Sequence, residues 1–201
     1  MVARATRRRA TKPRAATPNL QFHAVTHERL PDLARFSERH GKFRYCSCMR
    51  WRLTSTEFKA STKESRVARL DRLVERGTPI GVLAYLDGEP VGWCSIAPRP
   101  TYAALERFRA LPRLDDEPVW SVVCFFVDSG VRRRGITAGL LKAAVAYARA
   151  RGAKIIEGYP VEPGPRLYTY MGAPSTFHKA GFRDVTPRGN ERRVVRLVVR
   201  P

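Results

Sequence analysis

A basic turn, Arg132-Arg-Arg-Gly-Ile-Thr-Ala138, joins two apolar patterns in the second half of the chain. The run Val119–Val127 before it predicts a buried strand, and the apolar residues after it repeat at helical spacing as far as Gly152. A strand that leads into a helix directs free backbone N–H groups and the positive end of the helix dipole at one point. Because arginines flank this point, the turn predicts an anion site suited to a pyrophosphate. The alternative is a solvated turn that only caps an ordinary helix.

Several strands are expected around this turn. Two apolar runs within 79–97 flank Asp87-Gly88, which is a strong short-range signal for a β-hairpin. Further apolar segments predict strands over 21–26, 154–161 and 192–199. Together with the run before the turn, these segments indicate one sheet built from distant parts of the chain.

Helices are expected on either side of these strands. One helix is predicted over about 28–40, with Leu33 and Phe36 facing inward. A second is predicted after the capping box Ser61-x-x-Glu64, and Gly77 ends it. The helix after the basic turn has an apolar face made of Leu140, Leu141, Ala144, Val145 and Ala148.

The basic turn also resembles a family signature. Arg132-x-x-Gly135-x-Thr137 is similar to the Q/R-x-x-G-x-G/A motif of the GNAT superfamily of acetyl-CoA-dependent N-acetyltransferases, with Thr137 in place of the last small residue. The segment from Ala173 to Phe182 resembles the family's closing helix, A-x-x-x-Y-x-x-x-G-F. The resemblance covers about residues 20–200 and implies a single α/β domain. Its central sheet would be mixed and twisted, with six to seven strands flanked by helices and a splayed central strand that binds acetyl-CoA.

The resemblance assigns the cosubstrate residues. The end of the central strand would offer a backbone N–H to the thioester carbonyl, and the loop amides would hold the CoA pyrophosphate. Phe177 stands where the family commonly has a tyrosine, so it can pack on the pantetheine arm but cannot donate a proton. The expected cosubstrate-binding residues are Phe126, Val127, Arg132, Arg133, Arg134, Gly135, Ile136, Thr137, Ala138 and Phe177.

Acetyl transfer to an amine also needs a proton acceptor and a proton donor. Tyr170 is the preferred donor to the leaving thiolate, and solvent is the alternative. Glu157 is the preferred base because it is an acid within an apolar strand, where partial burial would raise its pKa. Pairing with an arginine or exposure to solvent are alternatives for Glu157, and Glu162 is the second candidate. The other candidate donors are Tyr168, Ser175, Thr176 and His178.

The segment from Tyr45 to Trp51 is expected to line the acceptor site, with these two aromatic residues as walls. Arg50 and Arg52 beside them would suit an acceptor with an apolar body and a negative group. Cys46 and Cys48 could form a redox pair, but partner ligands at metal-binding spacing are missing, so no metal is expected. The long connection 98–118 would lie on the same side and close the groove, which favours a small acceptor.

Composition sets the domain organisation. A chain of 201 residues with 43% apolar content can form one domain with a full core. Residues 1–19 are predicted to be a disordered basic arm, followed by the acetyltransferase domain over 20–201. The net charge is +20, and the arm could contact nucleic acid nonspecifically or be an unselected tail. With four scattered cysteines and no apolar run long enough for a bilayer, a cytoplasmic location without membrane contact is the simplest interpretation.

The resulting hypothesis is an acyltransferase that moves an acetyl group from acetyl-CoA to the primary amine of a small molecule. Acetylation of a protein N-terminus or lysine is a second hypothesis. A nonenzymatic module that binds acyl-CoA or nucleic acid is a third, prompted by Phe177 and the basic arm. The sequence is compatible with a homodimer but sets neither the oligomeric state nor the length of the acyl group.

Overall fold

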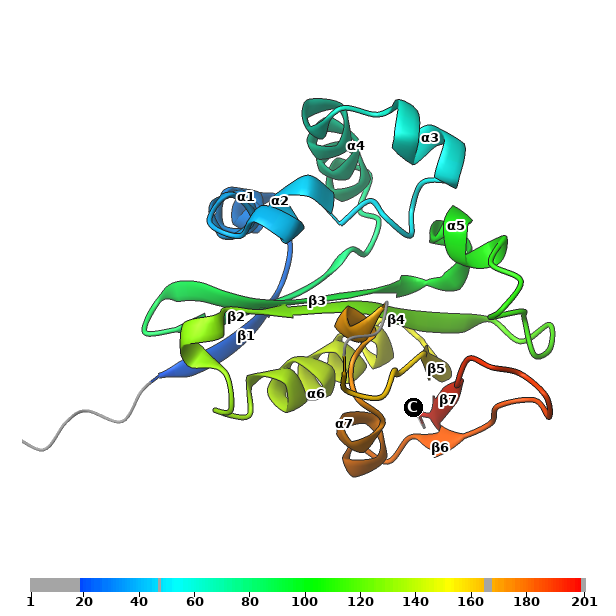
Figure 1. Cartoon of the computed structure of the whole chain (residues 1–201). Helices are drawn as coiled ribbons and strands as arrows, with labels where there is room; N and C mark the ends of the chain where they lie inside the picture. The colour runs from blue at the N-terminus through cyan, green and yellow to red at the C-terminus, as the bar shows by residue number, and fades with distance from the viewer. Residues whose placement is uncertain (1–18, 47, 165–167, 200–201) are drawn as a thin grey trace, which may run out of the picture.

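The computed structural model describes residues 19–46, 48–164 and 168–199. Nearly all of the expected basic arm therefore lies outside the described residues. Within them, seven strands form one sheet in the order β1-β2-β3-β4-β5-β7-β6 (Figure 1). Neighbouring strands are antiparallel except for β4 and β5, which are parallel. The strands are β1 (Leu20–Ala24), β2 (Gly81–Leu86), β3 (Glu89–Pro98), β4 (Val119–Val127), β5 (Ile155–Gly158), β6 (Arg183–Asp184) and β7 (Val195–Val198).

The parallel pair parts half-way along β4. On one side β4 pairs with β3 from Trp120 to Val127. On the other side β5 pairs only with Val119–Val122, and among the described strands none continues beside β4 beyond that point. A β-bulge marks the same place, because Ser95 lies opposite Cys124 and Ile96 lies opposite Val122. The sheet is therefore mixed and open at its centre, as expected for a splayed central strand.

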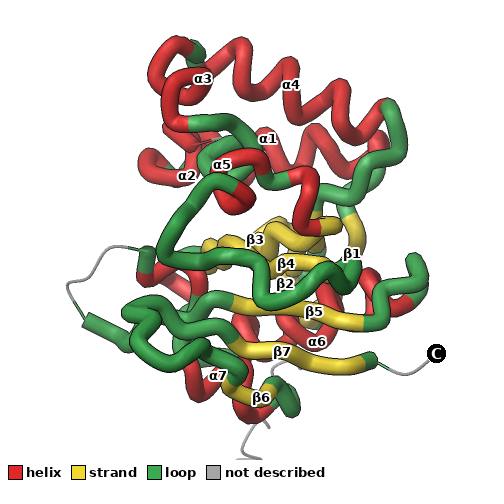
Figure 2. The backbone as a smooth tube through the Cα atoms, turned by 90° about the vertical axis from the view of Figure 1, so that its right-hand side faces the viewer, coloured by secondary structure: helices red, strands yellow, loops and turns green. Residues whose placement is uncertain are grey.

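Helices cover both faces of the sheet. In Figure 1 helices α1–α4 lie over one face and helices α6 and α7 over the other, and Figure 2 shows the same layers from the side. Strand β3 serves both layers, since Trp93 packs with the first group and Cys94 with the second. The helices are α1 (Leu30–Glu38), α2 (Gly41–Cys46), α3 (Ser55–Ala60), α4 (Lys63–Glu75), α5 (Ala103–Glu106), α6 (Ile136–Arg149) and α7 (Pro174–Lys179).

Most local expectations are confirmed. Asp87 and Gly88 adopt positive φ angles of 51° and 87° between β2 and β3, as a tight hairpin turn requires. Leu33 and Phe36 are buried on α1. One capping box was placed a residue too early: Thr62, not Ser61, caps α4, and its hydroxyl accepts a hydrogen bond from the Ser65 N–H at 3.2 Å. Ser61 instead donates to the Phe58 carbonyl at 2.7 Å.

The long connection between β3 and β4 is a packed part of the fold. It contains the short helix η2 (Arg99–Thr101) and α5, and its Tyr102, Leu105 and Leu111 side chains are fully buried. These residues form a third apolar cluster at the end of the sheet with Trp51 and Tyr159. The connection is thus held firmly against the ends of β4 and β5.

No described helix combines the length and apolar character that a bilayer span would need.

Candidate active site

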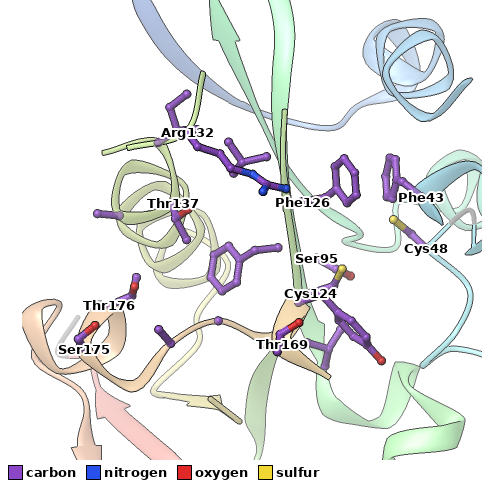
Figure 3. A pocket seen from close by; sticks show the side chains of 18 of the residues that line it. Phe43, Cys48, Ser95, Cys124, Phe126, Arg132, Thr137, Thr169, Ser175 and Thr176 are labelled. Carbon is purple, nitrogen blue, oxygen red and sulfur yellow. The ribbon is translucent and has the colours of Figure 1, made fainter. Parts of the chain in front are cut away.

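A cavity of about 880 Å³ begins where β4 and β5 part (Figure 3). It runs from the start of α6, along the free edge of β4, to the segment around Cys46–Trp51. The cavity therefore connects the three sites that the sequence placed far apart.

The first end of the cavity is basic. Gly135 caps α6 with a left-handed φ of 75°, a conformation that glycine adopts without strain. The backbone N–H groups that follow it, from Ile136 to Ala138, belong to the first turn of the helix and line the cavity. Arg132 lies beside them, while Ser175 and Thr176 of α7 line the opposite wall (Figure 3). Arg133 and Lys179 also line the cavity. Such an arrangement can hold a pyrophosphate.

The middle of the cavity is the free edge of β4. Val123, Cys124 and Phe125 to Val127 line it, and β5 leaves their backbone groups on this side without a strand partner. An apolar wall with open N–H and C=O groups suits an extended ligand that carries amides of its own. Phe126 stacks on Phe43 of α2 with ring centroids 5.3 Å apart (Figure 3).

The far end of the cavity combines thiols, aromatic rings and one arginine. Burial raises the pKa of the Cys46, Cys48 and Cys124 thiols, which are therefore uncharged near neutral pH. Burial also raises the pKa of Tyr170, which lies in the short helix η4 (Thr169–Met171) and lines the cavity. The phenol is therefore protonated near neutral pH. Arg50 and Trp51 complete this end.

A sequence model of the GNAT acetyltransferase family matches residues 46–172, well over half of the chain. The chain belongs to the GNAT acetyltransferase family. GNAT acetyltransferases are acyltransferases, and the open sheet described above is their fold. No curated protein sequence matches this GNAT chain.

Solved GNAT structures are similar to the chain in fold at low sequence identity. A polyamine N-acetyltransferase from Drosophila melanogaster is 12% identical with a TM-score of 0.54, over 90% of this chain and 100% of that one. A ribosomal-protein-alanine N-acetyltransferase from Brucella melitensis is 17% identical with a TM-score of 0.51, over 89% and 99%. YncA from Salmonella typhimurium, solved with acetyl-CoA, is 13% identical with a TM-score of 0.53, over 90% and 94%.

The two acids that the sequence offered as bases lie outside the lining of the GNAT cavity. Glu157 is 1% exposed and does not line the cavity. Its carboxylate accepts hydrogen bonds from Arg99 at 3.0 Å, Arg196 at 2.8 Å and Tyr159 at 2.7 Å. A carboxylate held by two guanidinium groups is a structural ion pair, so this geometry argues against Glu157 as the base and matches the arginine-paired alternative. Glu162 is exposed near Arg193, at 3.6 Å, and also lies outside the lining.

Phe177 is buried in the core beneath the GNAT cavity. It is fully buried, with its ring centroid 6.0 Å from that of Phe125 and 5.1 Å from that of Phe182. Gly158 of β5 makes room for it, because a Cβ there would lie 2.2 Å from the Phe177 ring. The ring supports the cavity wall from behind and is not itself part of the lining.

Most of the other expected residues line the cavity, and a few lie outside it. The cavity is lined by Phe126, Val127, Arg132, Arg133, Gly135, Ile136, Thr137, Ala138, Tyr170 and Trp51. Arg134 is exposed and outside the lining, as is His178. Tyr168 lines a smaller neighbouring cavity. The Tyr45 side chain lies outside the described part of the structure.

Sequence reasoning missed several lining residues, among them Lys179 and Phe43. Lys179 follows Phe177 by two positions in the closing helix, and its charge next to a predicted phosphate site was an available signal. Phe43 lies in the short helix α2, where no pattern indicated a functional side chain.

Proposed function

We propose that the chain transfers an acetyl group from acetyl-CoA to the primary amine of a small molecule. The observation that carries this proposal is the continuous cavity from the basic start of α6 to the aromatic end near Trp51. The first turn of α6 with Arg132 and Arg133 would hold the pyrophosphate. The free edge of β4 would align the pantetheine arm through backbone hydrogen bonds.

The reaction forms an amide bond and breaks a thioester bond. The amine nitrogen attacks the thioester carbonyl carbon, and the developing oxyanion would be stabilised by an open N–H group of β4 near Phe126 and Val127. Collapse of this intermediate releases the CoA thiolate, and Tyr170 would donate the proton that the thiolate takes up. Because the cavity holds both substrates in one place, positioning contributes much of the acceleration.

The described lining of the cavity contains neither a carboxylate nor an imidazole. The attacking amine must therefore arrive uncharged, and its surplus proton leaves to solvent rather than to a side chain. His40 packs beside β4, with its ring centroid 5.0 Å from that of Phe126, but it lies outside the lining.

The packed connection between β3 and β4 supports a small acceptor. Tyr102, Leu105 and Leu111 hold it in the core, and Trp51 packs against its Phe108 at a centroid distance of 5.5 Å. The acceptor end is thereby walled by the connection and the Cys46–Trp51 segment, where a protein segment would need an open groove.

Calorimetric titration with acetyl-CoA, followed by thiol release over a panel of primary amines, tests this function. Gly135→Asp should abolish binding, since it places a carboxylate and a strained backbone at the helix start. Arg134→Gln is the matched control because Arg134 lies outside the lining, and it should bind as the wild type does. Binding without thiol release for any amine would indicate a nonenzymatic acyl-CoA module. No binding by the wild type would overturn the proposal.

A further inference from the structure

We propose that the acceptor is an anionic amine: a primary amine that carries a carboxylate and an aromatic or similarly bulky apolar body, such as a free aromatic amino acid. This inference rests on the proposed acetyl transfer and names the substrate class of that site.

The acceptor end continues into a second cavity. It encloses about 260 Å³ and shares Arg50 and Trp51 with the main one. Phe108, Tyr168 and Arg107 form other parts of its wall. A molecule whose amine lies beside Cys124 and Tyr170 can therefore extend past Arg50 into this second space.

The charged side chains that line the acceptor end and the second cavity are all positive. Arg50 and Arg107 line the second cavity, and the described lining of both cavities includes no aspartate or glutamate. The Arg50 guanidinium lies over the rings of Trp51 and Phe58, at 5.7 and 5.8 Å, and no described carboxylate is within ion-pair distance of it. Glu57 is the acid whose charge acts on Arg107, but it is held by Thr54 and lies outside both linings.

Arg192 adds a third cation behind the aromatic wall. It lies over Tyr168 at 4.7 Å and over Phe108 at 6.0 Å, and burial lowers its pKa. Two other arginines in the molecule are paired with acids: Arg99 pairs with Glu157, and Arg196 pairs with both Glu157 and Asp115. At the acceptor end, Arg50 lines both cavities and is partly exposed, so its guanidinium can pair with the carboxylate of an acceptor.

The shape of the second cavity favours an apolar body. Trp51, Phe108 and Tyr168 form a triangle of rings with centroid separations of 5.5, 5.7 and 5.8 Å. Tyr168 adopts a left-handed φ of 67°, a strained backbone that is typical of residues held in place at functional sites. An aromatic side chain of the acceptor can pack against these rings.

An unused donor lies at the junction of the two cavities. Trp51 is 3% exposed, and its indole N–H has no hydrogen-bond partner in the described part of the chain. A buried donor without a partner carries a free-energy cost that an acceptor oxygen would remove. A carboxylate held by Arg50 would lie at the same end of the cavity as Trp51, whose ring centroid is 5.7 Å from the Arg50 guanidinium. Cationic acceptors such as polyamines would instead meet the unneutralised arginines.

Four acceptors of related size separate the possibilities: phenylalanine, phenylalaninamide, phenethylamine and agmatine. With the wild-type enzyme, kcat/KM calculated for the uncharged form of each amine should be higher for phenylalanine than for phenethylamine and for the amide by about tenfold or more, and agmatine should be the poorest acceptor. Arg50→Gln should raise the KM for phenylalanine by about tenfold, leave phenethylamine within about twofold, and leave the KM for acetyl-CoA unchanged. Arg109→Gln is the control, because Arg109 is exposed and outside both linings.

The outcomes distinguish the two proposals. If phenethylamine or agmatine is acetylated better than phenylalanine, the acetyltransferase function stands and the anionic acceptor is wrong. If Arg50→Gln slows all four acceptors equally, Arg50 does not recognise the carboxylate and the inference fails. If the wild type binds acetyl-CoA but releases no thiol with any amine, both proposals fall.

Discussion

The Arg99 guanidinium and the Glu157 carboxylate form an ion pair inside the protein, with Nη1 and Oε2 3.0 Å apart and both side chains 1% exposed. Arg99 also donates to the Leu111 carbonyl at 2.7 Å, and its Nε lies 2.8 Å from Glu106. Glu157 accepts from Arg196 of β7. One network therefore ties the connection before β4 to strands β5 and β7, and it accounts for an acid in an apolar strand without giving it a role in proton transfer.

Removal of this charge should affect stability rather than chemistry. Glu157→Gln should lower the free energy of unfolding by about 3 kcal/mol, because it removes the charge that pairs with both Arg99 and Arg196, although Arg99 keeps its ion pair with Glu106. Urea denaturation followed by tryptophan fluorescence measures the loss. Glu162→Gln is the matched control, since Glu162 is exposed, and should change stability by less than about 0.5 kcal/mol. Full stability of Glu157→Gln combined with a large loss of kcat would restore Glu157 as the base.

Thr137 stands where the family signature has a small residue, and its side chain lines the basic end of the cavity (Figure 3). Thr137→Val keeps the shape and removes the hydroxyl, so the KM for acetyl-CoA should rise by about tenfold if that hydroxyl donates to a phosphate. The KM for S-acetylpantetheine, which has no pyrophosphate, should not change. An equal effect on both donors would show that Thr137 acts only on packing.

Tyr170 should matter for turnover more than for binding. Tyr170→Phe removes the proposed proton donor and should lower kcat by about tenfold to a hundredfold, with little change in the KM for acetyl-CoA. Tyr147→Phe is the control, because it removes a phenol hydroxyl from α6 at a position outside the lining of both cavities. If Tyr170→Phe retains wild-type kcat, the thiolate takes its proton from solvent.

Restoring the family's usual tyrosine should not restore a proton donor. Phe177 is fully buried between Phe125, Phe182 and the backbone of Gly158, so a hydroxyl added by Phe177→Tyr would point into the core. The variant should lose about 1–3 kcal/mol of stability by overpacking and should not rescue Tyr170→Phe. Thermal unfolding and kcat of the double variant measure both effects; a rescued kcat would place position 177 within reach of the thiolate.

The pH dependence should follow the acceptor. Without a protein base in the described lining, kcat/KM should rise with pH until the acceptor amine is uncharged. The midpoint should therefore move to lower pH when phenylalanine is replaced by phenylalaninamide, whose amine is less basic. Burial raises the pKa of Tyr170 above its ordinary value, so the phenol stays protonated at every pH up to about 10. Over that range, deprotonation of Tyr170 should cause no loss of activity. A midpoint that is the same for both acceptors would indicate a base in the protein.

The fold was predictable where local signals determine it. Asp87-Gly88 fixes the β2–β3 hairpin, and the alternation of a strand, a glycine turn and an apolar helix face identifies β4 and α6. The capping box of α4 was misplaced by one residue because Ser61 and Thr62 are both suitable caps and only the packed structure selects one. Strand β6 is two residues long and carries no periodic pattern of its own.

The site was predictable only in part, because some of its contacts join residues that are far apart in the sequence. The basic turn contains its anion site within a few residues, so spacing alone indicated it. The partner of Glu157 is 58 positions away, and nothing in the β5 sequence reveals that Arg99 reaches it. The second cavity joins segments near Arg50, Phe108 and Tyr168, which meet only through the packing of the long connection. Contacts between residues so far apart in the sequence are determined by the tertiary fold.

Because β4 and β5 separate, the backbone groups of β4 from Val123 onward have no strand partner on the β5 side among the described strands. Under the proposed function, the pantetheine arm would form hydrogen bonds with these backbone groups as an added strand does, so the cosubstrate would stabilise the sheet as well as take part in the reaction. Because a ligand that binds only the folded protein stabilises it, the free energy of unfolding should then increase with the concentration of acetyl-CoA.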